Sequence, residues 1–170
     1  VALSLMCRNP LLEYGPKAYE DHKKKLSTYD VEQVVLAIVV TTGIASIFLT
    51  KDFTPDYNSG LAHAIFYALT SYPVIEKHHL HGEVVGFGVL LALLVDGEET
   101  EFEKVYELNK KIHLPVSLEE IEITEEQWEE SMNRIPEMSD VAHYPYKVTK
   151  EMLSEAMRKL KERVQEDGEK

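Results

Sequence analysis

Histidine is the residue type most able to do chemistry in this chain, and four of the seven histidines lie between positions 63 and 81. His63 stands within an apolar pattern of helical period, and His81 stands directly before a second such pattern. Neutral imidazole is the commonest protein ligand for zinc and also binds iron. Because the helix dipole disfavours a positive charge in the first turn, His81 is expected to be neutral and able to bind a metal.

The spacing of these histidines leaves two interpretations open. It matches neither the helical H-E-x-x-H motif nor paired C-x-x-C, so the residues alone allow either a metal site between two helices or ordinary histidines. His78 and His79 follow a charged pair in a polar connecting segment, and we expect both to be ordinary surface residues. His22 and His113 are expected at the surface and at a helix end, without a chemical role.

The elements that must hold His63 and His81 are predicted to be helices. A helix from residue 60 to about 72 should end before Pro73, because proline disfavours helical geometry at the residue before it. Residues 73–79 are predicted to connect it to the helix that follows His81. Gly82 and Gly86 lie four positions apart in that helix, which indicates close helix packing and argues against a phosphate-binding loop.

The N-terminal segment is predicted to contain a second helical region. Pro10 and Gly15-Pro16 should interrupt the chain before a charged helix at 17–26, and Asp30 is a candidate N-cap for a long helix from residue 31. The apolar stretch 34–49 is about sixteen residues long, shorter than the roughly 20 residues that span a bilayer. We therefore expect a buried central helix and no membrane span, followed by a loop at 51–60.

Three polar residues mark helix starts in the second half of the chain. Ser117 with Glu120, and Thr124 with Gln127, have the spacing of capping boxes, and each pair predicts the start of a short helix. Thr149 is the predicted cap of a last amphipathic helix.

These patterns together predict an all-α fold. An amphipathic helix at 99–112 and a turn at 136–148 complete the series, and no segment has a convincing strand pattern. We expect a compact bundle of about seven or eight helices that forms a single domain over residues 1–170.

Composition restricts the classes of partner and compartment. The formal net charge of −12 argues against a nucleic-acid partner, which requires a basic surface. The carboxylates concentrate in two late stretches, 96–107 and 119–130, where helical spacing should place most of them on solvated faces. Cys7 is the only cysteine, so no internal disulfide can form. A reducing, cytoplasmic location is expected.

Four sequence stretches resemble the glycerol dehydrogenase and iron-containing alcohol dehydrogenase superfamily. G-L-A-H-A-I-x-x-A-L-T at 60–70 and L-H-G-E-V-V-x-x-G-V-L at 80–90 resemble its metal-binding core. R-N-P-L-L-E-Y-G at 8–15 resembles the helix after its metal-binding aspartate segment, and V-A-H-Y-P-Y-K-V-T at 141–149 resembles its I-H-N-x-P-x-x-V-T turn. The resemblance implies an all-helical domain like the C-terminal domain of dehydroquinate synthase.

The resemblance also implies a metal site. In that superfamily a divalent metal lies between a nucleotide-binding domain and the helical domain, and in the glycerol dehydrogenase branch it is held by one aspartate and two histidines. His63 and His81 match the two histidines, whereas the aspartate would fall before Val1. Glu83 follows His81 by two residues and so points away from its helical face, from where it could orient a ligand or cap the helix start. The resemblance implies that His143 lies near the active site, and an ordinary loop histidine is the alternative. Phe66 stands where members that read H-A-I-H-N-G have a further histidine, so a related branch with another alcohol or polyol substrate is equally possible.

The implied function is that of the metal-binding helical domain of an NAD-dependent dehydrogenase for a small alcohol or polyol. Zinc is expected in preference to iron, and NAD is expected only in the complete enzyme, because the chain has no G-x-G-x-x-G motif after a strand. The isolated chain is expected to be inactive without a nucleotide-binding half, and a homo-oligomer is expected. The alternative is a non-catalytic helical module for oligomerisation or regulation.

Overall fold

In the computed structural model, residues 2–49 and 59–168 are described, and every regular element within them is helical. If the continuous helix at 29–49 is counted once, these residues form eight α-helices, so the predicted all-α fold is confirmed. The chain divides into two compact units, residues 1–58 and 59–170. The single domain over 1–170 stays a prediction.

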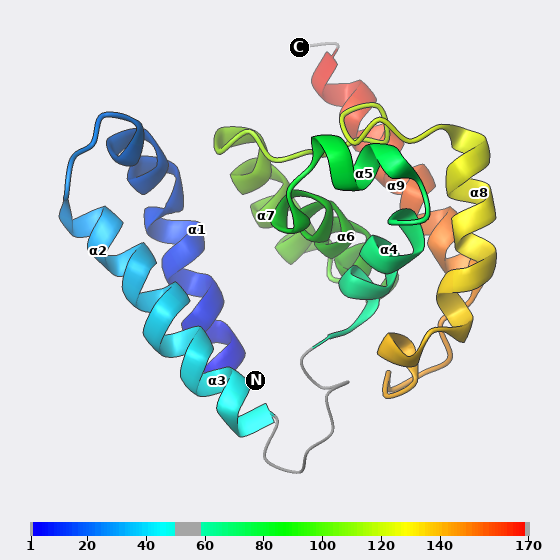
Figure 1. Cartoon of the computed structure of the whole chain (residues 1–170), viewed down its shortest axis with the longest axis horizontal. Coiled ribbons are helices and arrows are strands. Elements are labelled where there is room, and N and C mark those ends of the chain that lie inside the picture. The colour runs from blue at the N-terminus through cyan, green and yellow to red at the C-terminus, as the bar shows by residue number, and fades with distance from the viewer. Residues whose placement is uncertain (1, 50–58, 169–170) are drawn as a thin grey trace. The chain divides into compact units, whose positions relative to one another are not determined.

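The first unit is an antiparallel pair of long helices (Figure 1). Its elements are α1 (Ala2–Lys23), α2 (Tyr29–Leu36), the π-helical turn η1 (Ala37–Thr41) and α3 (Thr42–Leu49). The predicted interruptions at Pro10 and Pro16 are wrong, because α1 runs through both prolines. Helix α1 packs against α2 and η1, and this packing offsets the unfavourable helix propensity of the two prolines.

The turn between α1 and α2 is held by a buried carboxylate. Asp21 is 6% exposed, and it accepts hydrogen bonds from Lys17 Nζ at 2.5 Å and from Thr28 Oγ1 at 2.8 Å. Thr28, and not the predicted Asp30, is the N-cap residue of α2. The hydroxyl of Thr28 bonds to Asp21 and makes no side-chain bond to the first turn of α2, so this cap joins two helices.

Replacing Asp21 with asparagine is expected to destabilise the first unit at neutral pH. Hydrogen bonds from Lys17 and Thr28 lower the pKa of Asp21 below its ordinary value of 3.8. A lowered folded-state pKa stabilises the fold above the ordinary value, and this stability is lost as the pH falls through the folded pKa. Thermal unfolding followed by circular dichroism should therefore show a difference between wild type and Asp21→Asn that disappears in acid. The matched variant Asp30→Asn should have a smaller effect, since Asp30 lies 3.7 Å from Lys17 Nζ.

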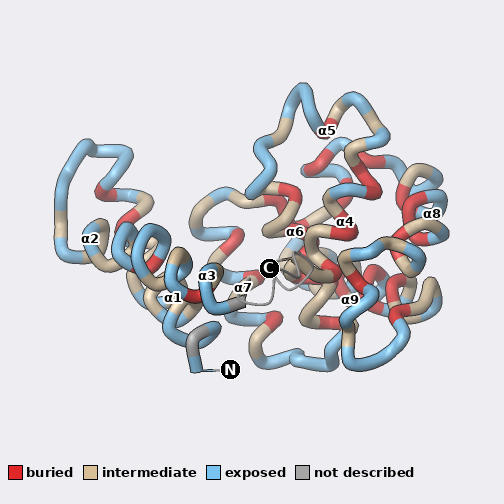
Figure 2. Tube along the Cα trace, turned by 60° about the horizontal axis from the view of Figure 1, so that its bottom comes forward, coloured by how far each residue is buried: buried red, intermediate tan, exposed pale blue. Residues whose placement is uncertain are grey.

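The continuous helix of α2, η1 and α3 is mostly exposed, which overturns the prediction of a buried central helix. The tube of this helix is coloured mostly as exposed (Figure 2). Among its described side chains only Ala37 and Ala45 are buried, whereas Val39 is 66% exposed and Ile47 is 72% exposed. Within the first unit α1 can cover only one face of this helix. The helical stretch Tyr29–Phe48 has 20 residues and a mean hydropathy of 2.0, so it is long and apolar enough to cross a membrane. Core helices of soluble proteins meet the same criteria, and the absence of a membrane span stays a prediction.

The second unit is a helical bundle that encloses α6. Its elements are α4 (Leu61–Leu69), α5 (Pro73–His78), α6 (His81–Val95), α7 (Glu99–Lys111), α8 (Glu125–Arg134), the 3₁₀ turns η3 (Ile135–Glu137) and η4 (Ser139–Val141), and α9 (Lys150–Gly168). Helix α6 packs against α4, α7 and α9. Most of the buried residues that the structure describes lie on these helices and on α8 (Figure 2).

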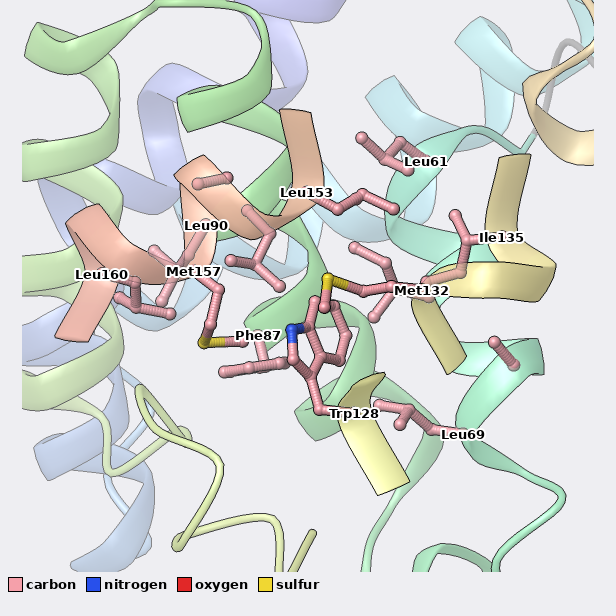
Figure 3. Packing of buried hydrophobic residues seen from close by; sticks show 14 of the residues in the cluster. Leu61, Leu69, Phe87, Leu90, Trp128, Met132, Ile135, Leu153, Met157 and Leu160 are labelled. Carbon is pink, nitrogen blue, oxygen red and sulfur yellow. The ribbon is translucent and has the colours of Figure 1, made fainter. Parts of the chain in front are cut away.

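The core of this unit is built around Trp128. The indole of Trp128 is 1% exposed and lies among Phe87, Met132 and Met157 (Figure 3). Leu90 from α6 is 0% exposed in the same cluster, so α6 contributes its apolar side chains to the centre of the bundle. Burial of this cluster removes apolar surface from water and stabilises the positions of the helices that surround it.

Two local predictions for the second unit are wrong, and two are confirmed. Residues 73–78 form helix α5, because Pro73 occupies the first helical position, where its missing N–H costs nothing. The segment after Ser117 forms a turn instead of a helix, since the carboxylate of Glu120 accepts from the backbone N–H of Val116. Thr124 caps α8 in a complete capping box, and Thr149 accepts from the backbone N–H in the first turn of α9.

The acidic residues of α7 are paired more than the sequence indicated. Glu103 and Glu107 lie at 3.0 Å from the guanidinium of Arg163 in α9, and Glu99 lies at 2.7 Å from Lys159 of the same helix. These ion pairs join α7 to α9 across the surface of the bundle. The predicted placement of most of these carboxylates on a solvated face is confirmed, since the Glu99, Glu103 and Glu107 side chains are exposed, and the ion pairs with α9 were not predicted.

Candidate metal centre

His63 and His81 lie side by side at the junction of α4 and α6. His63 is the third residue of α4, and His81 is the first residue of α6. Their ring centroids are 5.5 Å apart and their planes are inclined by 43°. Two residues that are eighteen positions apart in the sequence therefore form one pair, because α4 and α6 pack against each other.

Aromatic side chains surround this histidine pair. The ring of Phe66 meets the ring of His81 edge to face, with centroids 4.4 Å apart. The ring centroid of Tyr67 lies 6.4 Å from that of His63 and 5.3 Å from that of Phe66, and Tyr67 is 46% exposed. His81 is exposed and His63 is half-buried, so the pair is partly open to solvent and in contact with aromatic rings.

The surroundings of His63 favour its neutral form. Burial lowers the pKa of His63 below its ordinary value of 6.5, and the nearby imidazole of His81 lowers it further. The carboxylate of Asp140, in η4, acts in the opposite direction on this pKa. At neutral pH the His63 imidazole therefore carries a lone pair that a metal could accept. No sequence signal pointed to Asp140, because its proximity results from the packing of η4 against α4.

The spacing of the two rings suits two ligands of one metal ion. With zinc at about 2.0–2.1 Å from each coordinating nitrogen and near-tetrahedral angles, two imidazole centroids lie about 5 Å apart. The 5.5 Å separation of His63 and His81 is close to this value. Among residues 2–49 and 59–168, however, no group of three histidine, cysteine, aspartate or glutamate residues could hold a metal. His63 and His81 could therefore supply two ligands of such a site, and their role as metal ligands stays a prediction.

Glu83 fixes the start of α6, where His81 lies. Its Oε2 accepts the backbone N–H of Leu80 at 2.9 Å and lies 3.6 Å from Nδ1 of His79. The carboxylate thus binds the residue immediately before His81 and limits how the backbone enters the helix. A direct role of Glu83 toward a metal ligand stays a prediction.

The connection between α5 and α6 differs from the surface segment that the sequence indicated. His78 is exposed as expected, but the side chain of His79 is only 10% exposed. Glu122 Oε1 lies 2.9 Å from His78 Nδ1 and 3.6 Å from His79 Nε2. Glu122 has a φ of 56°, in the left-handed region, where residues other than glycine are uncommon. Glu122 could not be identified from the sequence, because its contact depends on how this turn folds back on α5.

His143 lies in the exposed segment after η4. The same segment is fastened at two points, since the hydroxyl of Tyr146 bonds to Asp96 at the C-terminal end of α6 and Tyr144 lies beside Gly60. His81 is at the opposite end of α6 from Asp96. The expected role of His143 near the active site stays a prediction.

Known proteins with similar sequences are dehydrogenases. No family model matches the sequence. A glycerol dehydrogenase of Escherichia coli is 32% identical over 130 residues, which are 74% of this chain and 32% of that protein. A glycerol dehydrogenase of Thermotoga maritima is 36% identical over 126 residues, or 71% of this chain and 31% of that protein. The chain thus corresponds to about a third of the length of these relatives.

The fold has a counterpart among solved structures. The structure of a probable glycerol dehydrogenase from Sinorhizobium meliloti matches 97% of this chain and 45% of that chain, with a TM-score of 0.79 at 20% sequence identity. The helical architecture is therefore one that occurs within a larger dehydrogenase. Taken with the sequence matches, this places the chain in the glycerol dehydrogenase family, as a counterpart of part of those enzymes.

Proposed function

We propose that this chain is the metal-binding helical part of an NAD-dependent dehydrogenase that oxidises a small alcohol or polyol of the glycerol type. The observation that carries the proposal is the pairing of His63 and His81, with ring centroids 5.5 Å apart on two packed helices. Zinc is preferred over iron, since zinc is commonly held by imidazole and carboxylate ligands. Membership of the glycerol dehydrogenase family supports the same function.

The described residues have separate roles in this proposal. A bound divalent cation would supply Lewis acidity to an alcohol oxygen. His63 and His81 donate the two imidazoles, and Phe66 limits the rotation of the His81 ring by its edge-to-face contact. Tyr67 is proposed to contact the substrate, since it is 46% exposed and its ring centroid lies 6.4 Å from that of His63. A third ligand and the NAD-binding part are proposed to come from a nucleotide-binding partner domain, and we propose that the protein works in the cytoplasm.

The test is a titration of the purified chain with zinc, followed by an assay of NAD⁺ reduction with glycerol. We expect one weakly bound zinc per chain and no dehydrogenase activity, because two ligands and no cofactor site make an incomplete centre. Cobalt(II) added in place of zinc should give visible absorption bands of a nitrogen-ligated ion. A chain that binds no metal, or that oxidises glycerol by itself, would contradict the proposal.

A non-catalytic module for self-association is a second candidate, favoured by the exposed apolar helix of the first unit. Val39, Ile47 and Phe48 are each more than 60% exposed, which is unusual for large apolar side chains on one helix. If self-association is the main function, sedimentation velocity should show a homo-oligomer that forms without metal. The variant Ile47→Lys should then shift the chain toward the monomer, whereas a wild-type monomer would remove this candidate.

A further inference from the structure

Gly88 allows the backbones of α4 and α6 to come unusually close. This glycine is buried in the middle of α6, and a Cβ built on it would lie 2.7 Å from the carbonyl oxygen of Ala62 and 3.0 Å from its Cα. Both are backbone atoms of α4, so no side-chain rotation can relieve the overlap. Any larger residue at position 88 therefore requires the two helices to move apart.

The other two glycines of α6 lack this constraint. A Cβ on Gly82 would meet no atom within 4 Å, and a Cβ on Gly86 would meet only Cδ1 of Leu114 at 3.4 Å and Nδ2 of Asn109 at 3.8 Å. Those neighbours are side-chain atoms, which can adjust by small rotations. The tight contact is thus specific to position 88 and is not a general property of the glycines in this helix.

The contact at Gly88 lies beside one proposed ligand and on the same helix as the other. Ala62 immediately precedes His63 in α4, and His81 begins α6. For a Cβ at position 88, the distance to the Ala62 oxygen must grow from 2.7 Å to the ordinary contact range above 3.4 Å. Because each helix moves as a stiff unit, part of this displacement is passed to the two imidazoles.

We infer that Gly88 is a positioning residue for the His63–His81 pair. The hydrogen atom that serves as its side chain sets the spacing of α4 and α6, and this spacing sets the distance between the two rings. The role in metal binding rests on the proposed function above, whereas the effect on ring spacing does not. Binding sites tolerate displacements of only about 0.5 Å before the geometry of their ligands fails.

The experiment compares Gly88→Ala with Gly86→Ala, the same chemical change two positions away on the same helix. Zinc affinity is measured by calorimetry, and the ring contact between Phe66 and His81 is measured without metal by NMR, as a nuclear Overhauser effect. Gly88→Ala should weaken zinc binding by at least about tenfold, since a binding site must hold its ligands within about 0.5 Å of the productive geometry. It should also weaken the Phe66–His81 signal. Gly86→Ala should leave both unchanged.

If Gly88→Ala folds poorly, the same substitution is tested in a stabilised variant of the chain. Alanine favours helix over glycine at an unstrained site, so Gly82→Ala together with Gly86→Ala should stabilise α6 without the clash. Gly88→Ala is then added to this pair, and circular dichroism establishes that the helix content is retained. The comparison of the triple variant with the double variant repeats the test in a folded chain.

The outcomes separate this inference from the proposed function. If a folded variant that carries Gly88→Ala keeps the zinc affinity and the ring signal of its control, Gly88 has no positioning role. If the wild type binds no zinc, the proposed function fails, but the Phe66–His81 signal still decides whether Gly88 sets the ring spacing. Weaker zinc binding together with a weaker ring signal supports both.

Discussion

Replacing both His63 and His81 with alanine should abolish stoichiometric zinc binding by this chain. The two imidazoles are the described donors that converge at the junction of α4 and α6, and a metal cannot be held there after both are removed. Loss of a residue that only hydrogen-bonds to a metal ligand weakens metal binding by about 10- to 100-fold. Each single histidine substitution removes a ligand itself and should weaken zinc binding by more than this. Equilibrium dialysis followed by elemental analysis measures the zinc content directly.

The control for this experiment is His22→Ala. His22 lies exposed in the last turn of α1, in the first unit, so its removal takes away an imidazole without touching the pair. Zinc content should be unchanged in that variant. If the double variant instead retains the zinc content of the wild type, the metal binds elsewhere and the assignment of both ligands is wrong.

Leu90→Ala should strongly destabilise the second unit. The side chain of Leu90 is 0% exposed and lies at the centre of α6, within the cluster around Trp128 (Figure 3). Truncation of a buried leucine loses its transfer free energy and leaves a cavity, at a cost of about 2–5 kcal/mol. Urea unfolding followed by far-UV circular dichroism gives the free energy of unfolding.

Leu80→Ala provides the matched comparison. Leu80 is 73% exposed and its backbone N–H, which donates to Glu83, is unaffected by the substitution. The free energy of unfolding should therefore change by less than about 0.5 kcal/mol. Equal losses in the two leucine variants would show that the cluster around Leu90 does not dominate the stability of the second unit.

Periodicity and caps predicted the helical fold because these signals are local. Thr124 and Thr149 mark the starts of α8 and α9 correctly, since a cap involves residues three positions apart. The burial of the apolar helix at 29–49 could not be predicted in this way. Its hydropathy indicates a buried element, but exposure depends on which other helices cover it, and within the first unit α1 alone packs along its described residues.

The candidate site was predictable only in part for the same reason. The resemblance of the sequence identified His63 and His81, and the packing of α4 against α6 places them together. Asp140 and Glu122 were missed because each reaches its histidine through a turn that is distant in the sequence. His79 was expected at the surface, yet the turn that carries Glu122 covers it.

The position of Trp128 determines which part of this protein its intrinsic tryptophan fluorescence can monitor. Trp128 is the only tryptophan of the chain and it is 1% exposed within the second unit. Its emission spectrum is therefore an intrinsic optical label for one of the two units, while the paired helices of the first unit contain tyrosine but no tryptophan. A red shift would mark the moment at which water enters the bundle around α6, whatever the first unit does at that moment.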